Sequence, residues 1–477
     1  MSIGTRNIYR ALIVLTFSVL LAACSASEPP RPTVSLHDAV NIGDLEQLER
    51  HIYWGSDVNA ENDKHLTAIM LAFAEKKFDV MDLLLENGAD INKTSAFPRG
   101  SRGKERRTSH IFRGAPIHYA AFVGDLEGVD YLLKQKARVN EFNFNNELCE
   151  KKGCYTPLHI SILNKDKEMI QKLAAAGSDI NKANIEKGGR RSSPLASALA
   201  SAQPDIAKLI IELGGNPNLP NENGLTPLHI ASVIGYIDIV KLLVEKGVDI
   251  NAVYTEKHFG IVDHSTPIDK VYETEPNKNT PEIVDYLISN GALAGVIKKV
   301  EFPKTKPPRS KGYLKSKLIK AVQNNKTSVV RRLIKRGADV ESVGLCALSV
   351  ITSIDIWGQF IEAGARNINC KNEHNYAPLH QLSLWVEPRP EVLKVIRILI
   401  ALGADVNEEG FTVFKQTPLY NAAMRGNLRI AHILLSNGAD VNVKDRNNYT
   451  PLDIAVEHKH EKVIKLLKLH GGESGSQ

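Results

Sequence analysis

The sequence lacks the short motifs by which many enzymes can be recognised. Its 477 residues contain no HExxH metal motif, nucleophile elbow, phosphate-binding loop or glycine-rich dinucleotide turn. Aromatic residues make up only 6% of the chain. Long apolar runs are also missing, because the one candidate, residues 11–21, is too short to span a bilayer. We therefore predict a protein that is not an enzyme, and we expect no cofactor, no metal and no transmembrane helix.

The first residues predict an exported protein with a lipid anchor. Arg6 and Arg10 precede the apolar run, which ends in the letters LAAC at Cys24. This arrangement resembles the signal peptide and lipobox of bacterial lipoprotein precursors. The resemblance implies cleavage after Ala23, a lipid on Cys24 and a place in the cell envelope. Because Ser25 follows the cysteine, it favours the outer membrane, facing the periplasm. The alternative is an ordinary signal peptide with an incidental cysteine.

The predicted mature chain carries only a mild positive charge. The full sequence has a formal net charge of +6, and loss of Arg6 and Arg10 with the signal peptide removes two of these charges. So mild a balance indicates no particular class of partner. Residues 25–33 include three prolines and are expected to form a short extended spacer between the lipid and the folded part.

One stretch, Gly224–Asn251, recurs in recognisable copies along most of the chain. Thr226 is suited to cap a helix, and Pro227 occupies the first helical position, where a missing N–H costs nothing. Apolar residues then follow at helical spacing in two segments, which Gly235 and Gly247 end. This helix pair resembles the ankyrin repeat, which has a period of about 33 residues and buries its apolar face only against neighbouring repeats.

The resemblance implies an all-α fold, an ankyrin-repeat solenoid of about twelve helix pairs with finger hairpins. It further implies a protein-binding scaffold whose fingers and inner helices form a concave surface. Prolines interrupt the pattern once, so two arrays are expected, and the sequence leaves open whether they stack as one solenoid. The predicted boundaries are 1–23 for the signal peptide, 24–34 for the lipidated tether, 35–292 for the first array, 293–313 for a basic linker, 314–472 for the second array and 473–477 for a disordered tail.

Extra residues between the repeats mark the loops in which binding is expected. Most of them follow the Asn that ends a repeat, at the position of the ankyrin finger. Exposed aromatic side chains in such loops can anchor an interface, or each ring can cover a neighbouring finger instead. The insertion 385–390 differs, because it falls between the two helices of its own repeat. The finger aromatics are Phe97 and Phe112 together with the six candidate partner-binding residues Phe142, Phe144, Tyr254, Phe259, Phe411 and Phe414.

Two basic segments suggest an alternative function. The insertion 99–113 and the linker region 298–320 each hold a single acidic residue among many Lys and Arg. Such segments can bind an anionic component of the envelope, with Arg102, Arg106 and Arg107 as candidates, or remain solvated loops. The expected envelope location argues against nucleic acid. The first hypothesis remains a protein partner of unknown identity, bound by a monomeric protein attached to the membrane through its lipid.

Four cysteines remain besides Cys24. Cys149 and Cys154 lie in one inserted finger, where a local disulfide would stiffen a loop that has no core of its own. Cys346 is expected to be a small buried hydrophobic residue and Cys370 a loop thiol. A disulfide between these two rests on the even number of cysteines alone.

Histidine recurs at the fourth place of the TPLH-like helix starts. The positions are separated by the repeat period, so each histidine belongs to a different repeat and no metal site is indicated. The resemblance to ankyrin repeats implies a structural role for them. The four residues are His118, His159, His229 and His380.

Overall fold

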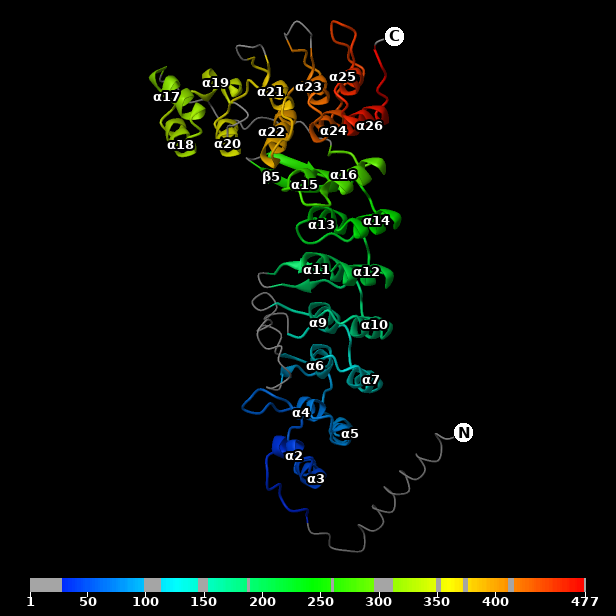
Figure 1. Ribbon diagram of the computed structural model, residues 1–477. Helices are drawn as coiled ribbons and strands as arrows, with labels where there is room; N and C mark the ends of the chain where they lie inside the picture. The colour runs from blue at the N-terminus through cyan, green and yellow to red at the C-terminus, as the bar shows by residue number, and fades with distance from the viewer. Residues whose placement is uncertain are drawn as a thin grey trace. The chain divides into compact units, whose positions relative to one another are not determined.

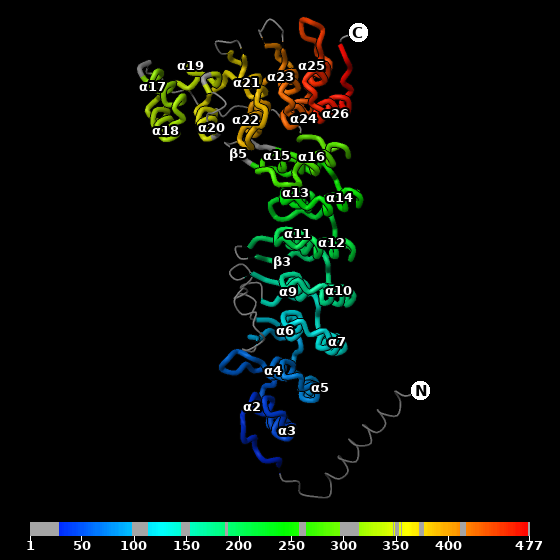
Figure 2. The backbone as a smooth tube through the Cα atoms, in the orientation of Figure 1, coloured from blue at the N-terminus to red at the C-terminus, as the bar shows by residue number. Residues whose placement is uncertain are grey.

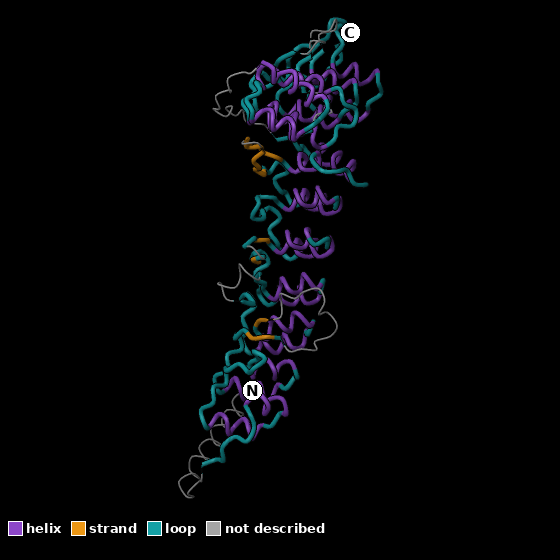
Figure 3. Tube along the Cα trace, turned by 90° about the vertical axis from the view of Figure 1, so that its left-hand side faces the viewer, coloured by secondary structure: helices purple, strands orange, loops and turns teal. Residues whose placement is uncertain are grey.

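In the computed structural model, the chain is a succession of helix pairs (Figures 1 and 2). Strands in the described ranges are limited to short pieces in the loops that join these pairs (Figure 3). The predicted all-α solenoid is therefore confirmed. The structure describes residues 28–97, 113–144, 153–186, 189–258, 261–295, 312–348, 353–371, 376–410 and 416–475.

The chain divides into two compact units. The first comprises residues up to Asp179 together with Asn184–Arg190, and the second comprises Ile180–Ala183 and Arg191–Gln477. The second unit therefore contains parts of both predicted arrays. Described elements of the first unit are α2 (Leu36–Ile42) with α3 (Leu45–Tyr53), α4 (Ala68–Ala74) with α5 (Phe78–Glu86), α6 (Pro116–Val123) with α7 (Leu126–Lys134), α9 (Pro157–Asn164) with α10 (Lys167–Ala175), the antiparallel strands β1 (Ser95–Ala96) and β2 (Arg113–Gly114), and β3 (Asn184–Ile185).

The second unit continues the same pattern of helix pairs. In the predicted repeat 344–369, the described part of the first helix is the single turn η1 (Leu345–Ala347), which precedes α20 (Ile354–Glu362). The other described elements are β4 (Arg191–Ser192), α11 (Pro194–Ala200), α12 (Pro204–Glu212), α13 (Pro227–Ile234), α14 (Ile237–Glu245), β5 (Tyr254–His258) antiparallel to β6 (Ile261–Ser265), α15 (Pro267–Tyr272), α16 (Thr280–Ser289), α17 (Gly312–Gln323), α18 (Thr327–Lys335), α19 (Val340–Val343), α21 (Pro378–Ser383), α22 (Pro390–Ala401), α23 (Pro418–Met424), α24 (Leu428–Ser436), α25 (Pro451–Glu457) and α26 (Glu461–Leu469).

Several first helices start after a threonine whose side chain caps them, as the sequence predicts. At α13, the Thr226 side chain accepts the backbone N–H of His229, and Pro227 is the first helical residue. His229 returns the contact, because its Nδ1 accepts the backbone N–H of Thr226 at 3.3 Å. Its Nε2 lies 3.3 Å from the carbonyl oxygen of Ser265 and donates to it. The histidine thus joins its own helix cap to the end of the next finger, which is a structural role.

Asparagine side chains hold successive repeats at a fixed distance. The Oδ1 atom of Asn407 accepts the backbone N–H of Asp440 at 2.7 Å, and its Nδ2 donates to the carbonyl of Gly438 at 3.0 Å. Each bond therefore joins the end of one repeat to the end of the next. Oδ1 makes the corresponding bond at Asn59, Asn92, Asn140, Asn181, Asn218, Asn251, Asn369 and Asn442.

We expect the variant Asn407→Ala to unfold at a lower denaturant concentration than the wild type. It removes both bonds to the following repeat, which corresponds to about 1–2 kcal/mol of stability. Urea denaturation followed by circular dichroism measures the loss, and hydrogen exchange of the Asp440 amide reports it locally. Asn447→Ala, at an exposed asparagine, is the matched control. Equal midpoints for the two variants would contradict the role assigned to Asn407.

Candidate functional site

The described finger aromatics pack against the repeats. Phe97 is 7% exposed, and its ring centroid lies 5.2 Å from that of Tyr119. Phe144 is buried against Cys154, with the half-buried Phe142 packed beside it. These contacts favour the alternative in which each ring packs against its own protein and is not exposed for binding a partner. Three further candidates, Phe259, Phe411 and Phe414, lie outside the described residues.

Tyr254 also has an internal contact. Its ring lies 6.3 Å from the ring of His229, and the ammonium group of Lys270 sits 4.8 Å from its centroid. Lys270 in turn binds Glu256 at 2.7 Å and Glu273 at 2.8 Å. The finger formed by β5 and β6 is thereby fastened to α15. Tyr254 is half-buried, so its outer edge remains accessible.

The described basic residues of the two candidate segments differ in their surroundings. Arg113, at the end of the first segment, forms an ion pair with Glu61 and so has an internal partner. Lys315, Lys317 and Lys320 lie on the exposed side of α17. Binding of an anionic component remains a prediction, because Arg102, Arg106 and Arg107 lie outside the described residues.

The structure corrects the prediction for Cys346 and Cys370. The two residues form a disulfide, with their Cα atoms 5.8 Å apart. The bond joins η1 to the loop after α20, within the predicted repeat 344–369. A covalent link of this kind stabilises the fold by restricting the unfolded chain.

The other cysteine predictions remain open. Cys154 is disulfide-bonded and fully buried. Cys149, its predicted partner, lies outside the described residues, so that pairing stays a prediction. The same holds for Cys24 and for the lipid that the sequence predicts there. Among the described helices, none combines the length and hydropathy that crossing a bilayer requires.

The end of the predicted tether is docked on the first helix pair. The indole N–H of Trp54 donates to the carbonyl of Pro29 at 3.1 Å, and the guanidinium of Arg31 lies 4.9 Å from the indole centroid. Further along, His51 Nε2 donates to the carbonyl of Val34 at 2.8 Å. The last residues of the predicted spacer, from Pro29 on, therefore contact the first repeat.

A buried ion pair joins the two predicted arrays within the second unit. Arg397 of α22 lies 2.6 Å from the carboxylate of Asp269 in α15, and both side chains are at most 2% exposed. The guanidinium also donates to the carbonyl of His264 at 2.8 Å. Asp269 in addition accepts the backbone N–H of Gly295 at 2.6 Å. The last repeat of the first array is thus covered by helices of the second array.

A second polar chain crosses the same junction. His432 of α24 is fully buried; its Nε2 donates to the carbonyl of Ala292 at 3.0 Å, and its Nδ1 accepts from the hydroxyl of Tyr272 at 2.9 Å. This arrangement requires a neutral imidazole, because one ring nitrogen must accept. Burial lowers the pKa of His432 to about 4. The ring therefore stays uncharged at neutral pH and joins the two arrays.

Comparison with known proteins identifies the repeats. A family model described as ankyrin repeats (3 copies) matches residues 36–143, 158–254 and 389–476, and a second ankyrin-repeat model matches 117–174. Human NF-kappa-B inhibitor alpha is 33% identical over 116 residues, which cover 23% of this chain and 34% of that protein. Human transient receptor potential cation channel subfamily A member 1 is 25% identical over 91% of this chain and 36% of that protein.

A solved structure shows the same kind of likeness. The ankyrin repeat domain of Bcl-3 is 21% identical, with a TM-score of 0.39, over 54% of this chain and 99% of that domain. Matches to the first curated relatives span between 14% and 36% of the relatives' own length. The chain therefore corresponds to about a third, or less, of each of these proteins.

We expect acid to weaken the second unit through His432. Its folded pKa of about 4 lies below the ordinary value of 6.5, so its full contribution is present above pH 6.5 and is lost as the pH falls towards 4. Such a shift amounts to up to roughly 3 kcal/mol.

Urea denaturation at several pH values measures this dependence. Burial also lowers the pKa values of His118 and His229 to about 4, so these residues add to the pH dependence of stability. The contribution of His432 is therefore obtained by comparing the wild type with its variants. His432→Gln should show a shallower loss of stability than the wild type. His458→Gln, at an exposed position, should keep the wild-type slope. A slope unchanged in His432→Gln would show that this histidine is not held neutral in the fold.

Proposed function

Because the chain belongs to the ankyrin-repeat family, we propose that it is a non-catalytic scaffold that binds a protein partner. The observation that carries this proposal is an exposed aliphatic side chain in the last two residues of several first helices. The repeat itself does not need such a side chain, because the apolar face of the helix is already buried against its neighbours. These residues are Ile42 (70% exposed), Leu163 (36%), Ile234 (39%) and Val456 (53%).

Exposed aliphatic side chains near the ends of several first helices suit a protein surface better than a small ligand. Apolar contacts at the centre of an interface supply much of its binding free energy. Likeness to human NF-kappa-B inhibitor alpha, an inhibitor by name, agrees with a protein partner. The buried finger aromatics leave these exposed helix-end residues as the better candidates for contact.

We further propose that the scaffold is attached to the bacterial envelope through a lipid on Cys24. The sequence around Cys24 supports this proposal. The contact of the tether with the first helix pair limits the distance between the lipid and the first repeat. Because Pro29 contacts the first helix pair, the stretch from Cys24 to Glu28 spans at most ~14 Å even if fully extended. The first repeat, with Ile42, would then stay close to the membrane surface, and the other partner-binding positions would follow in later repeats.

Partner binding is tested by cross-linking in envelope extract followed by identification of the captured protein. We expect Ile234→Asp with Val456→Asp to reduce capture of that protein about tenfold or more, because a carboxylate at an apolar contact must be desolvated. Leu469→Asp is the matched control, since Leu469 is an exposed aliphatic residue at the end of a second helix (59% exposed). Equal loss in both variants, or capture independent of both, would contradict the proposed surface.

Lipid attachment is tested by fractionation with acyl labelling. We expect Cys24→Ala to lose the label and to move from the membrane fraction to the soluble fraction, because the described helices offer no other anchor. Ser25→Ala, which keeps the cysteine, should remain labelled and membrane-bound. A Cys24→Ala protein that stayed at the membrane and still carried the label would exclude this anchor.

A further inference from the structure

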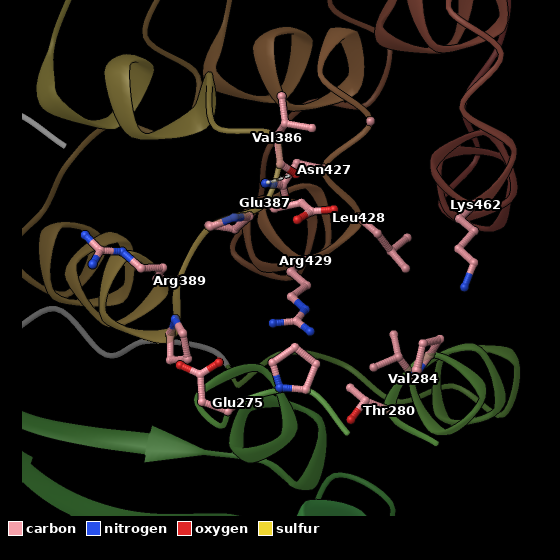
Figure 4. A pocket seen from close by; sticks show the side chains of 15 residues that line it. Glu275, Thr280, Val284, Val386, Glu387, Arg389, Asn427, Leu428, Arg429 and Lys462 are labelled. Carbon is pink, nitrogen blue, oxygen red and sulfur yellow. Dashed lines mark hydrogen bonds between the residues drawn. The ribbon is translucent and has the colours of Figure 1, made fainter. Parts of the chain in front are cut away.

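A cavity of about 440 Å³ lies in the second unit, between the last repeat of the first array and the helices that cover it (Figure 4). Two long loops between paired helices form part of its wall. Other pairs are joined by a short turn, such as Gly235 and Tyr236 between α13 and α14, whereas residues 273–279 separate α15 from α16 and residues 384–389 separate α21 from α22. The second of these loops contains most of the insertion 385–390 that stood apart in the sequence.

Arg429 is the central charge of this cavity. It belongs to the first turn of α24, and its side chain extends into the open space, with Glu387 and Glu275 on either side in Figure 4. The side chain is half-buried, and among the described residues it forms no ion pair or hydrogen bond. Its guanidinium carbon lies 5.8 Å from the ring of Tyr272. A cation is thus held in a partly dry place with no carboxylate in contact with it, although the negative charges of Glu275 and Glu387 act on it from nearby.

The other charges of the wall make the cavity suitable for both signs. Lys462 stands at one edge, where it binds Asp285 at 2.8 Å, and Arg389 stands exposed at another. Glu275 and Glu387 have no ion-pair partner among the described residues either. A phosphate dianion would face these two carboxylates, whereas a molecule with one carboxylate and one ammonium group would meet opposite charges on both the cationic and the acidic residues of the wall.

We propose that this cavity binds a small zwitterion, a molecule with one carboxylate and one ammonium group, such as a free amino acid or a short peptide. Arg429 holds the carboxylate through two parallel N–H···O bonds, which its planar guanidinium can make and an ammonium cannot. Glu275 and Glu387 receive the ammonium group. The proposal does not depend on the protein partner proposed above, because none of the exposed aliphatic residues at the helix ends lines the cavity.

The local electrostatics agree with this assignment. Burial lowers the pKa of Arg429 below its ordinary value, although the group stays charged. A half-buried charge that has lost part of its hydration gains most from an incoming counter-ion. Prolines at 276, 281, 388 and 390 hold the surrounding loops in restricted conformations, so little ordering free energy is spent on binding.

The test is isothermal titration calorimetry on the full chain at low salt. The probes are L-alanine and dialanine as zwitterions, N-acetylalanine as a carboxylate alone, alaninamide as an ammonium alone, and inorganic phosphate. We expect a zwitterion to bind at least about tenfold more tightly than either single-charge probe and than phosphate. Comparison of L-alanine with dialanine separates a free amino acid from a peptide as the ligand.

The variants assign the binding to this cavity. Arg429→Gln should weaken binding of the zwitterion about tenfold or more. Arg429→Lys should weaken it less, since lysine keeps the positive charge but cannot make the two parallel N–H···O bonds. Arg446→Gln, at an exposed arginine outside the cavity, is the matched control and should bind as the wild type does. Glu275→Gln with Glu387→Gln should weaken the zwitterion while leaving N-acetylalanine unchanged or slightly tighter.

Three results would overturn the proposal. The first is the absence of binding heat for every zwitterion up to about 10 mM. The second is equal affinity in Arg429→Gln and in Arg446→Gln. The third is tighter binding of phosphate than of any zwitterion. If circular dichroism shows that Arg429→Gln does not fold, Arg429→Lys takes its place, and the same order of affinities is required.

Discussion

The structure depends on the contact between each repeat and the next. A single helix pair leaves an apolar face uncovered, and burial of that face requires a neighbour at a fixed distance. The terminal asparagine sets this distance, as Asn251 does through the N–H of Leu293 and the carbonyl of Gly291. Each such contact spans one repeat only. Loops of different lengths can therefore be inserted between repeats without disturbing the stacking, because loop closure costs little more as a loop grows.

The series of hydrogen bonds made by the terminal asparagines is interrupted at the end of the first array, where contacts with helices of the second array follow. Gly295 stands where the other repeats have Asn, and a side chain there would meet the carbonyl oxygen of His264 at 2.2 Å. Helices α22 and α24 then cover the last repeat through Arg397 and His432. Because a buried charge is costly unless its partner is in place, the ion pair of Arg397 with Asp269 favours one register of the two arrays.

Local features were predictable from the sequence, and contacts between distant segments were not. The threonine caps and the proline at each helix start act within four residues, so Thr226 and Pro227 indicate their helix directly. The burial of Phe144 beside Cys154 depends on packing between strands and loops that no local pattern encodes. A signal for the junction was present in residues 390–401, where apolar residues lie on all sides of the helix and Arg397 stands between Ile396 and Ile398. An outer helix that faced water would need a polar side, and this one has little.

Insertions have different consequences according to where they enter the repeat. Those after the terminal asparagine extend the fingers, and the described aromatics there fold back onto the frame. Those between paired helices instead bond to the turn of the neighbouring repeat, as Asn279 does to the carbonyl of Gly235 at 2.7 Å. Two such loops face each other across the cavity, which apolar residues could have filled at a gain in stability. The chain instead places Arg429, Glu275 and Glu387 there, and the half-buried charge of Arg429 costs free energy that stacking of the repeats does not require. A bound molecule of opposite charges would recover that cost.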